Sequence, residues 1–254
     1  MMRVTRSTGG GAASDARRIY VGIDDTDTLD TPGTNQLARR LAEVLPSGFA
    51  LVAALRHQLL FDSRVPYTSK NGCASLVLRG TADASIDDLL SVFRDEMRAW
   101  YVPGSDPGLC VGETIPEAVM TFGRRAQREL VRQADARSLA RECGLTLEGF
   151  GGTEDGVIGS LAGVGLAARG DDGRVVNLPG WGWPDGFAGV QPVAAVRARG
   201  VDEVRDAASG KPVEAGLIDV GKHLRPSYRN GRVVLFVEAA DNGDQTRWQA
   251  LKLP

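Results

Sequence analysis

A short apolar run that ends in a cluster of acids is the feature that most constrains this chain. Ile19–Ile23 is rich in β-branched and aromatic residues, which indicates a buried strand, and the carboxylates of Asp24, Asp25 and Asp27 follow directly. Carboxylates crowded at the end of a strand repel one another, and a hard cation such as Mg²⁺ relieves that repulsion. The run therefore suggests a metal site with phosphate ligands. The alternative is a turn whose Asp and Thr side chains cap the next helix.

Composition narrows the class of protein. With 254 residues the chain is long enough for one domain with two lobes or for two small domains. The 30 Lys and Arg residues nearly balance 32 Asp and Glu residues, so the chain lacks an overall basic footprint for nucleic acid, although a local basic patch is allowed. Cys73, Cys110 and Cys143 lie far apart, which argues against a zinc ribbon or a disulfide framework and favours the cytoplasm. Residues 1–17 hold no apolar run, so we expect a flexible leader and neither a signal peptide nor a membrane span.

The order of the first elements predicts an α/β (α+β) fold. We expect residues 18–115 to form a βαββαβ unit, which is the order of a ferredoxin-like split sheet with helices on one face. The expected strands cover residues 19–23, 49–55, 73–78 and 109–111, and the expected helices cover residues 33–45 and 86–100.

A second α/β lobe is expected over residues 116–189. It would hold one long basic helix over 118–141, a glycine-rich loop over 149–156, a helix of small residues over 157–168 and a strand over 174–178. Residues 190–254 are expected to form a β-rich segment, with strand-like runs at 193–196 and 233–237.

Two loops carry residues suited to bind phosphate. The glycine-rich loop leads straight into a helix, whose N-terminal N–H groups attract anions, but it matches neither the P-loop nor the dinucleotide pattern. By itself we interpret it as a tight turn in which Gly159 and Gly163 permit close helix packing. The second loop, residues 65–72, offers hydroxyls and Lys70 to a phosphorylated ligand, or else is a solvated connection with an ordinary Asn71–Gly72 turn.

The histidines and tryptophans support weaker interpretations. His57 and His223 are the only histidines, which excludes a histidine-rich metal site, and we interpret His57 as a half-buried residue bonded to backbone. Trp181 and Trp183 fit stacking on a base, but we favour a small apolar cluster under a loop.

Four segments occur in an order that resembles a known family. They are Gly22–Asp27, Val65–Gly72, Ser105–Gly108 and the stretch from Gly149 to Ala162. In this order they resemble the GIDDTD, IPYKTRGNGA-like, TDPG-like and GxGxGxIGALAA-like motifs of the catalytic half of archaeal isoleucine-tRNA agmatinylcytidine synthetases. The first motif is specific to the family. The four motifs in this order, which together span roughly residues 18–178, are stronger evidence for the resemblance than any one of them.

The resemblance implies a kinase-like domain that uses ATP and Mg²⁺ to phosphorylate a tRNA cytidine, joined to a ferredoxin-like domain, with agmatine then displacing the phosphate. It also implies an autophosphorylated threonine, which falls on Thr34, although Asn35 and Gln36 differ from the family pattern. The family adds an OB-fold and a zinc ribbon that we do not expect here. We therefore favour a shortened relative that keeps the nucleotide site and acts on another substrate, such as a small molecule.

The sequence hypothesis is Mg²⁺-dependent phosphoryl transfer from ATP in which Asp24, Asp25 and Asp27 hold the metal. Thr34 and Lys70 complete the expected catalytic group. The residues expected to bind the nucleotide are Thr26, Thr28, Gly33, Asn71, Gly72, Gly151, Gly152 and Gly156. Two alternatives stay open: a tRNA-modifying enzyme that uses the arginines of residues 124–141, and a nucleotide or metabolite sensor without catalysis.

Overall fold

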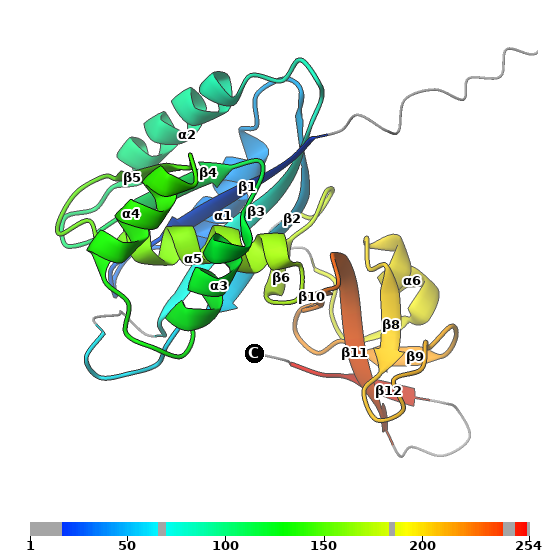
Figure 1. Ribbon diagram of the computed structural model, residues 1–254. Helices are drawn as coiled ribbons and strands as arrows, with labels where there is room; N and C mark the ends of the chain where they lie inside the picture. Colours follow the sequence, from blue (N-terminus) through cyan, green and yellow to red (C-terminus); the bar gives the residue numbers. More distant parts are fainter. Residues whose placement is uncertain (1–16, 66–69, 183–185, 241–246, 253–254) are drawn as a thin grey trace, which may run out of the picture.

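A computed structural model describes residues 17–65, 70–182, 186–240 and 247–252. Its strands, within those residues, join in one twelve-stranded sheet of order β5-β4-β1-β3-β2-β6-β10-β11-β12-β9-β7, with β8 paired to β11 (Figure 1). The strands are β1 (Arg17–Asp24), β2 (Phe49–Gln58), β3 (Gly72–Gly80), β4 (Gly108–Gly112), β5 (Thr146–Gly149), β6 (Arg174–Asn177), β7 (Val190–Pro192), β8 (Glu203–Asp206), β9 (Leu217–Asp219), β10 (Ser227–Arg229), β11 (Arg232–Ala240) and β12 (Arg247–Ala250). The helices are α1 (Thr34–Glu43), α2 (Ile86–Trp100), α3 (Glu117–Ala126), α4 (Gln133–Glu142), α5 (Gly156–Arg169) and α6 (Val193–Ala198).

The first six elements form the expected ferredoxin-like unit. Strands β4, β1, β3 and β2 lie side by side and are antiparallel at every junction. On one face, Ile19, Val21 and Ile23 of β1 pack with Leu37 of α1 and Phe93 of α2 in one core cluster. The mixed α/β fold with this unit is confirmed.

Helices α3, α4 and α5 cover the opposite face of the same sheet (Figure 1). The expected continuous helix over residues 118–141 is wrong, because α3 ends at Ala126 and α4 begins at Gln133. The Leu60 N–H donates to the Ala126 carbonyl at 3.0 Å, so a strand-end loop takes a carbonyl that a longer helix would have used itself. The chain therefore turns over residues 127–132.

Helix α5 lies with its backbone directly on the sheet. A Cβ on Gly22 of β1 would come within 1.9 Å of the Ser160 carbonyl oxygen, and a Cβ on Gly108 of β4 would come within 2.2 Å of the Gly156 backbone. Such contacts exclude any side chain larger than hydrogen. The interpretation of the small residues in this helix as a device for close packing is confirmed, since Gly163 also approaches the Ala74 carbonyl oxygen, with its Cβ position at 3.3 Å.

The C-terminal part of the chain is β-rich, as expected, and lies to one side of the helix-covered sheet (Figure 1). It joins the rest through β6, which pairs with β2 and with β10. The strand expected at residues 193–196 is wrong, because this run forms α6. Pro192 precedes its first residue, and Val193 and Val196 sit three apart and are both buried, which suits a helix.

Several general expectations concern the whole chain. All three cysteines are free. Among the described residues, no helix is both long and apolar enough to cross a bilayer. The expected leader lies outside the described residues except for Arg17, which begins β1. Division of the chain into domains at residues 115 and 189, and a cytoplasmic location, stay predictions.

Candidate active site

Asp24 is the last residue of β1, and Asp25 follows it, beside the start of α5. Because side chains alternate along a strand, Asp24 shares the α5 face with Gly22. The Asp24 carboxylate lies against Gly159, whose missing Cβ would fall 1.7 Å from its Oδ2. Asp25 adopts a left-handed backbone conformation with φ of 50°, which is uncommon for a residue with a side chain and is concentrated at functional sites.

A cavity of about 340 Å³ opens beside these carboxylates, a volume in the range of small-ligand sites. Three kinds of side chain line it. The acidic members include Asp24, Asp25, Asp27 and Asp155, the basic members are Arg56, Arg64 and Lys70, and the larger apolar members are Leu59, Leu60, Val65, Leu130, Val131 and Ile158. Acidic, basic and apolar surface in one cavity suits a ligand with a metal-bound polyanion and an apolar ring.

The acidic members of the cavity are electrostatically unfavourable in one another's presence. Burial, together with the negative charges of Asp25 and Asp27, raises the pKa of Asp24 to about 8. Burial, together with the charges of Asp106, Asp27 and Asp155, raises the pKa of Asp25 to about 6. None of Asp24, Asp25 and Asp27 forms an ion pair with a described basic residue. A bound cation would therefore lower the free energy of the ionised site.

The carboxylates of the cavity fit Mg²⁺ only if phosphate oxygens of a ligand and water supply the remaining ligands of the ion. Across the described part of the chain, no three His, Cys, Asp or Glu side chains are arranged to hold a metal by themselves. The predicted three-aspartate ligand set is thus not preformed. Mg²⁺ commonly takes one or two carboxylates and completes its shell with water and phosphate oxygens. The crowded carboxylates at the end of β1 could supply such ligands.

Thr34 lies in the cavity beside the Asp27 carboxylate. It begins α1, is largely buried and lines the cavity. Its hydroxyl donates to Asp27 Oδ1 at 2.9 Å and accepts from the Thr26 hydroxyl at 3.2 Å. A hydroxyl bonded to a carboxylate is the arrangement by which a base activates a nucleophile. Thr26 therefore contacts Thr34 and does not itself line the cavity. The Thr28 N–H and hydroxyl bond within their own loop to Thr31.

The loop before β3 supplies the next predicted group. Lys70 is exposed and lines the cavity. Asn71 also lines it, but the side-chain amide donates to the Leu60 carbonyl at 2.7 Å and so holds the wall together. Gly72 makes room for Arg56, whose Nη2 lies 2.8 Å from the position of a Cβ. Residues 66–69 of the predicted loop lie outside the described residues.

The predicted glycines divide into two groups. Gly33, at the N-cap of α1, and Gly156, at the start of α5, both line the cavity. Gly151 and Gly152 do not line it. The Asp106 carboxylate takes the space beside Gly152 and accepts the Thr153 N–H at 2.5 Å, so a carboxylate of the chain already occupies this loop as an anion would.

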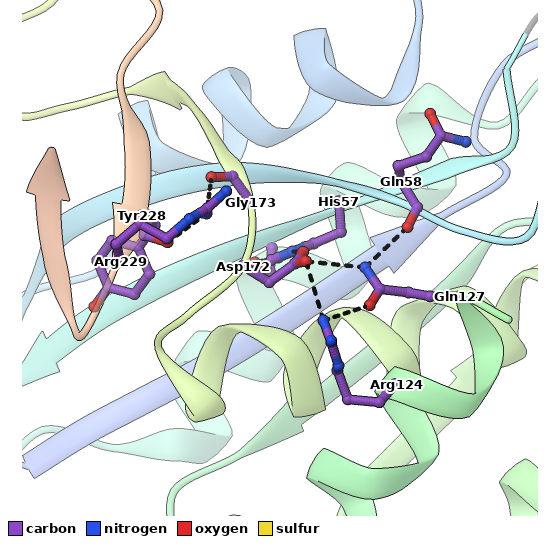
Figure 2. A network of polar contacts seen from close by, with 9 residues as sticks. His57, Gln58, Arg124, Gln127, Asp172, Gly173, Tyr228 and Arg229 are labelled. Carbon is purple, nitrogen blue, oxygen red and sulfur yellow. Dashed lines mark hydrogen bonds and ion pairs between the residues drawn. The ribbon is translucent and has the colours of Figure 1, made fainter. Parts of the chain in front are cut away.

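His57 belongs to a buried side-chain network rather than to a backbone contact (Figure 2). Its Nδ1 lies 2.7 Å from Asp172 Oδ1, and its Nε2 lies 2.8 Å from the Ser75 hydroxyl. Gln127 of the turn after α3 donates to Asp172 Oδ2 at 3.0 Å and to the Gln58 carbonyl at 3.1 Å. Ser75 and His57 have no exposed surface, so the network ties β2, β3, α3 and the turn before β6 together.

Trp181 packs against the C-terminal core cluster, and its indole N–H donates to the Arg199 carbonyl at 2.7 Å. The Arg199 guanidinium lies 5.5 Å from the Trp181 ring centroid. Trp183 lies outside the described residues.

The sequence offered little indication that Leu130 and Val131, or the charged residues Arg56 and Asp155, would line the cavity. Leu130 and Val131 line the cavity because the helix breaks at residues 127–132, whereas their apolar spacing favours a continuous helix. Asp155 was part of the glycine-rich segment without a predicted role, and Gly159 was predicted only to permit close helix packing. Arg56 directly follows the expected strand over residues 49–55, and its place at the start of the polar segment after that strand is the one signal that pointed to it.

Comparison with known proteins agrees with the arrangement of strands and helices. No family model matches the chain. A curated relative, the tRNA 2-agmatinylcytidine synthetase TiaS of Cenarchaeum symbiosum, is 26% identical over 202 residues, which cover 74% of this chain and 44% of the relative. The chain resembles part of TiaS. It spans less than half the length of that relative.

Solved structures give the same result for the fold. A crystal structure of TiaS with its isoleucine tRNA and ATP superposes with a TM-score of 0.51 and 20% identity, over 59% of this chain and 36% of that one. A crystal structure of a tRNA fluorescent labelling enzyme has a TM-score of 0.51 and 22% identity, over 58% of this chain and 36% of that one. The resemblance inferred from the motifs is confirmed as a resemblance to part of TiaS.

Proposed function

We propose that the chain is an ATP- and Mg²⁺-dependent phosphoryl-transfer enzyme related to TiaS. The observation that carries the proposal is the cavity itself, in which crowded carboxylates, three cationic side chains and an apolar wall meet at the ends of β1, α1 and α5. The solved complex of TiaS with tRNA and ATP supports the choice of nucleotide.

In this proposal the residues divide the work by charge. Asp24 and Asp25 would hold Mg²⁺, with Asp27 beside them, and the bound ion would supply positive charge to neutralise the phosphates of ATP. Arg56 and Lys70 contact phosphate oxygens, since guanidinium and ammonium groups suit such ligands. The apolar wall that includes Leu130 packs against the adenine ring.

Thr34 is the proposed first acceptor. Its hydroxyl lies in the cavity and bonds to Asp27. In this proposal Asp27 takes the hydroxyl proton while the oxygen bonds to the γ-phosphorus of ATP, and the bond from that phosphorus to ADP breaks so that ADP leaves. The relative's name identifies tRNA as the molecule that it modifies. The comparisons thus favour the tRNA alternative, and they lend no support to the small-molecule acceptor that the sequence favoured.

The test measures binding and turnover separately. Calorimetric titration with a non-hydrolysable ATP analogue and Mg²⁺ should show saturable binding by the parent chain. Asp25→Asn should lower ATP turnover on the order of 100-fold, because electrostatic stabilisation of the transferring group is lost. Asp30→Asn is the matched control, since Asp30 is an exposed acid of the same loop and does not line the cavity. Equal Mg²⁺-dependent turnover in parent and Asp25→Asn would remove the carboxylates from the chemistry.

Binding of the analogue without any turnover, in the presence of a candidate tRNA, would favour the nucleotide sensor. Absence of binding would remove the nucleotide site altogether.

A further inference from the structure

Helix α4 holds the loop before α5 with side chains that do not themselves line the cavity. Arg137 Nη2 lies 2.5 Å from Glu154 Oε2, in an ion pair. The side-chain amide of Gln133, the first residue of α4, donates to the Thr153 carbonyl at 2.8 Å and to Asp155 Oδ1 at 3.3 Å. Two side chains of one helix therefore hold three consecutive residues of the loop.

Glu154 reaches Arg137 from an uncommon backbone conformation. Its φ is 61°, in the left-handed region that residues with a side chain rarely adopt. Its side chain crosses Gly149 of β5, where a Cβ would fall 2.5 Å from the Glu154 Cβ, so a larger residue there would block this path. Strained residues of this kind persist where the surrounding structure holds them, and they concentrate at functional sites. The conformation of Glu154 therefore has a cause beyond local preference.

Stability of the fold gives little reason for this ion pair. The side chains of Arg137 and Glu154 are 29% and 43% exposed, and ion pairs with such exposure contribute little to the free energy of unfolding. A left-handed glutamate lowers that free energy, because its Cβ approaches the following carbonyl oxygen, and a glycine would avoid the cost. The pair therefore has more to do with where the loop lies than with how stable the fold is.

The contacts of α4 join two sides of the cavity. Shortly before α4 begins, Leu130 and Val131 line the cavity as part of its apolar wall. The held loop ends in Asp155 and Gly156, which line the cavity on its acidic side. Gly156 in turn packs on the end of β1, since its Cβ position lies 2.9 Å from the Asp24 carbonyl oxygen. The distance between the apolar wall and the carboxylates thus depends on the contacts between α4 and the loop.

We propose that Arg137 and Glu154 form a latch that fixes this distance, and that both are positioning residues for the transfer step. The inference rests on the phosphoryl-transfer function proposed above and adds two residues that lie outside the cavity. With the latch in place, a nucleotide whose ring packs on the wall presents its phosphates to the carboxylates at the right distance. Without it the two sides shift relative to each other, and a displacement of about 1 Å slows a reaction on the order of 100-fold.

The experiment measures ATP turnover and backbone hydrogen exchange in the parent, in Arg137→Gln, in Glu154→Gln and in the double variant. We expect kcat to fall at least tenfold in each single variant while KM for ATP stays within threefold, because the binding contacts remain and only their spacing changes. Since the two residues act as one unit, the double variant should lose no more than either single variant. Amide exchange over residues 153–157 should be faster in all three variants than in the parent.

Two further chains separate positioning from support of the fold. Arg98→Gln removes the exposed ion pair with Asp95 on α2, far from the cavity lining, and should keep kcat within twofold of the parent. Glu154→Gly removes the latch together with the left-handed strain, so its melting temperature should not fall while its kcat falls as in Glu154→Gln. A residue that only supported the fold would lose stability and activity together.

The outcomes keep the latch apart from the function on which it rests. Unchanged kcat in both single variants would overturn the latch, and so would rate losses that multiply in the double variant or amide exchange that matches the parent. In each of these cases the parent still turns over ATP, so the proposed function stands. A parent chain that shows no ATP turnover would contradict the proposed function, and the latch with it.

Discussion

Single side chains at the end of β1 set the chemistry that this cavity offers. Asp24 has its place because Gly159 has no side chain, and Thr34 is held by the hydrogen bond that its hydroxyl donates to Asp27. These contacts join the acidic turn, the first helix and the glycine-rich helix at one point. Small changes there should alter activity before they alter the fold.

Gly159→Ala tests that dependence directly. The new methyl group would overlap the Asp24 carboxylate, whose atoms begin 1.7 Å from the Cβ position, so the carboxylate must move. A displacement of about 1 Å at a reacting centre costs on the order of 100-fold in rate, and we expect a loss of that size in ATP turnover. Gly163→Ala on the same helix is the control, because the atoms nearest to its Cβ position, in Cys73 and Ala74 of β3, lie 3.3 Å away. Similar turnover in the two variants would contradict the role assigned to this contact.

Thr34→Val tests the proposed acceptor hydroxyl. The substitution keeps the shape of the side chain and removes the group that Asp27 contacts. After incubation with labelled ATP and Mg²⁺, the parent should carry phosphate on residue 34 and Thr34→Val should carry none, as judged by mass spectrometry. Thr31→Val is the control: Thr31 does not line the cavity and Thr34 is unchanged, so this chain should still be labelled. Label on the Thr34→Val chain would place the acceptor elsewhere.

Among the elements, α5 and the buried network around His57 decide where the site forms. Backbone contact between α5 and β1 brings the helix start to Asp24, and the Asp172 carboxylate anchors the loop that follows α5 against β2 and α3 (Figure 2). Burial alone would raise the pKa of Asp172, but hydrogen bonds from His57 and Gln127 outweigh it and leave that pKa lowered.

Asp172→Asn should therefore destabilise the protein in a pH-dependent way. A carboxyl group with a lowered folded-state pKa stabilises the fold above the unfolded-state pKa of about 4 and loses that contribution as pH falls through the folded value. We expect Asp172→Asn to lower the free energy of unfolding by about 1–3 kcal/mol at pH 7, with a difference that shrinks below pH 4. Asp171→Asn, one residue away and exposed, should have little effect. Denaturant unfolding at several pH values measures both, and a constant difference across pH would contradict the assignment.

The charges of the complete molecule nearly cancel, with a formal net charge of -2, and the cavity at the end of β1 gathers both signs. Carboxylates line it together with the cationic side chains of Arg56, Arg64 and Lys70. This combination suits a phosphorylated ligand that binds with a cation, as proposed above. It also makes ligand binding depend on pH.

Binding of the Mg²⁺–nucleotide complex should strengthen as pH rises from 6 to 8. Asp24 and Asp25, with pKa values raised to about 8 and about 6, must lose their protons to face the metal. We expect affinity to rise about tenfold per pH unit below the pKa of Asp24. Without metal the same raised pKa values destabilise the fold as pH rises from about 4 to 8, so added Mg²⁺ and nucleotide should raise the melting temperature most at pH 8. Asp24→Asn should flatten this dependence, and an unchanged profile in that variant would contradict it.

The residues in sequence determined much of this protein. Strand alternation, helical spacing and the acid cluster predicted the βαββαβ unit, the end of β1 and the carboxylates of Asp24, Asp25 and Asp27, because these signals are local or follow from a known order of elements. The polar loop over residues 65–72 pointed to Lys70, and the resemblance to a known family pointed to Thr34. The break between α3 and α4 was missed, since it depends on a hydrogen bond from Leu60, far away in the chain.

Only the tertiary structure decided which residues face the cavity and what surrounds them. Residues of the helix break supplied the apolar wall, Asp106 occupied the loop of Gly151 and Gly152, and β6 brought Arg174 beside Arg56. The physical reason is that burial, repulsion between charges and close backbone packing act between segments distant in sequence. A local pattern identifies the groups that can do chemistry, but the packing of α5 and the C-terminal strands fixes which of them meet.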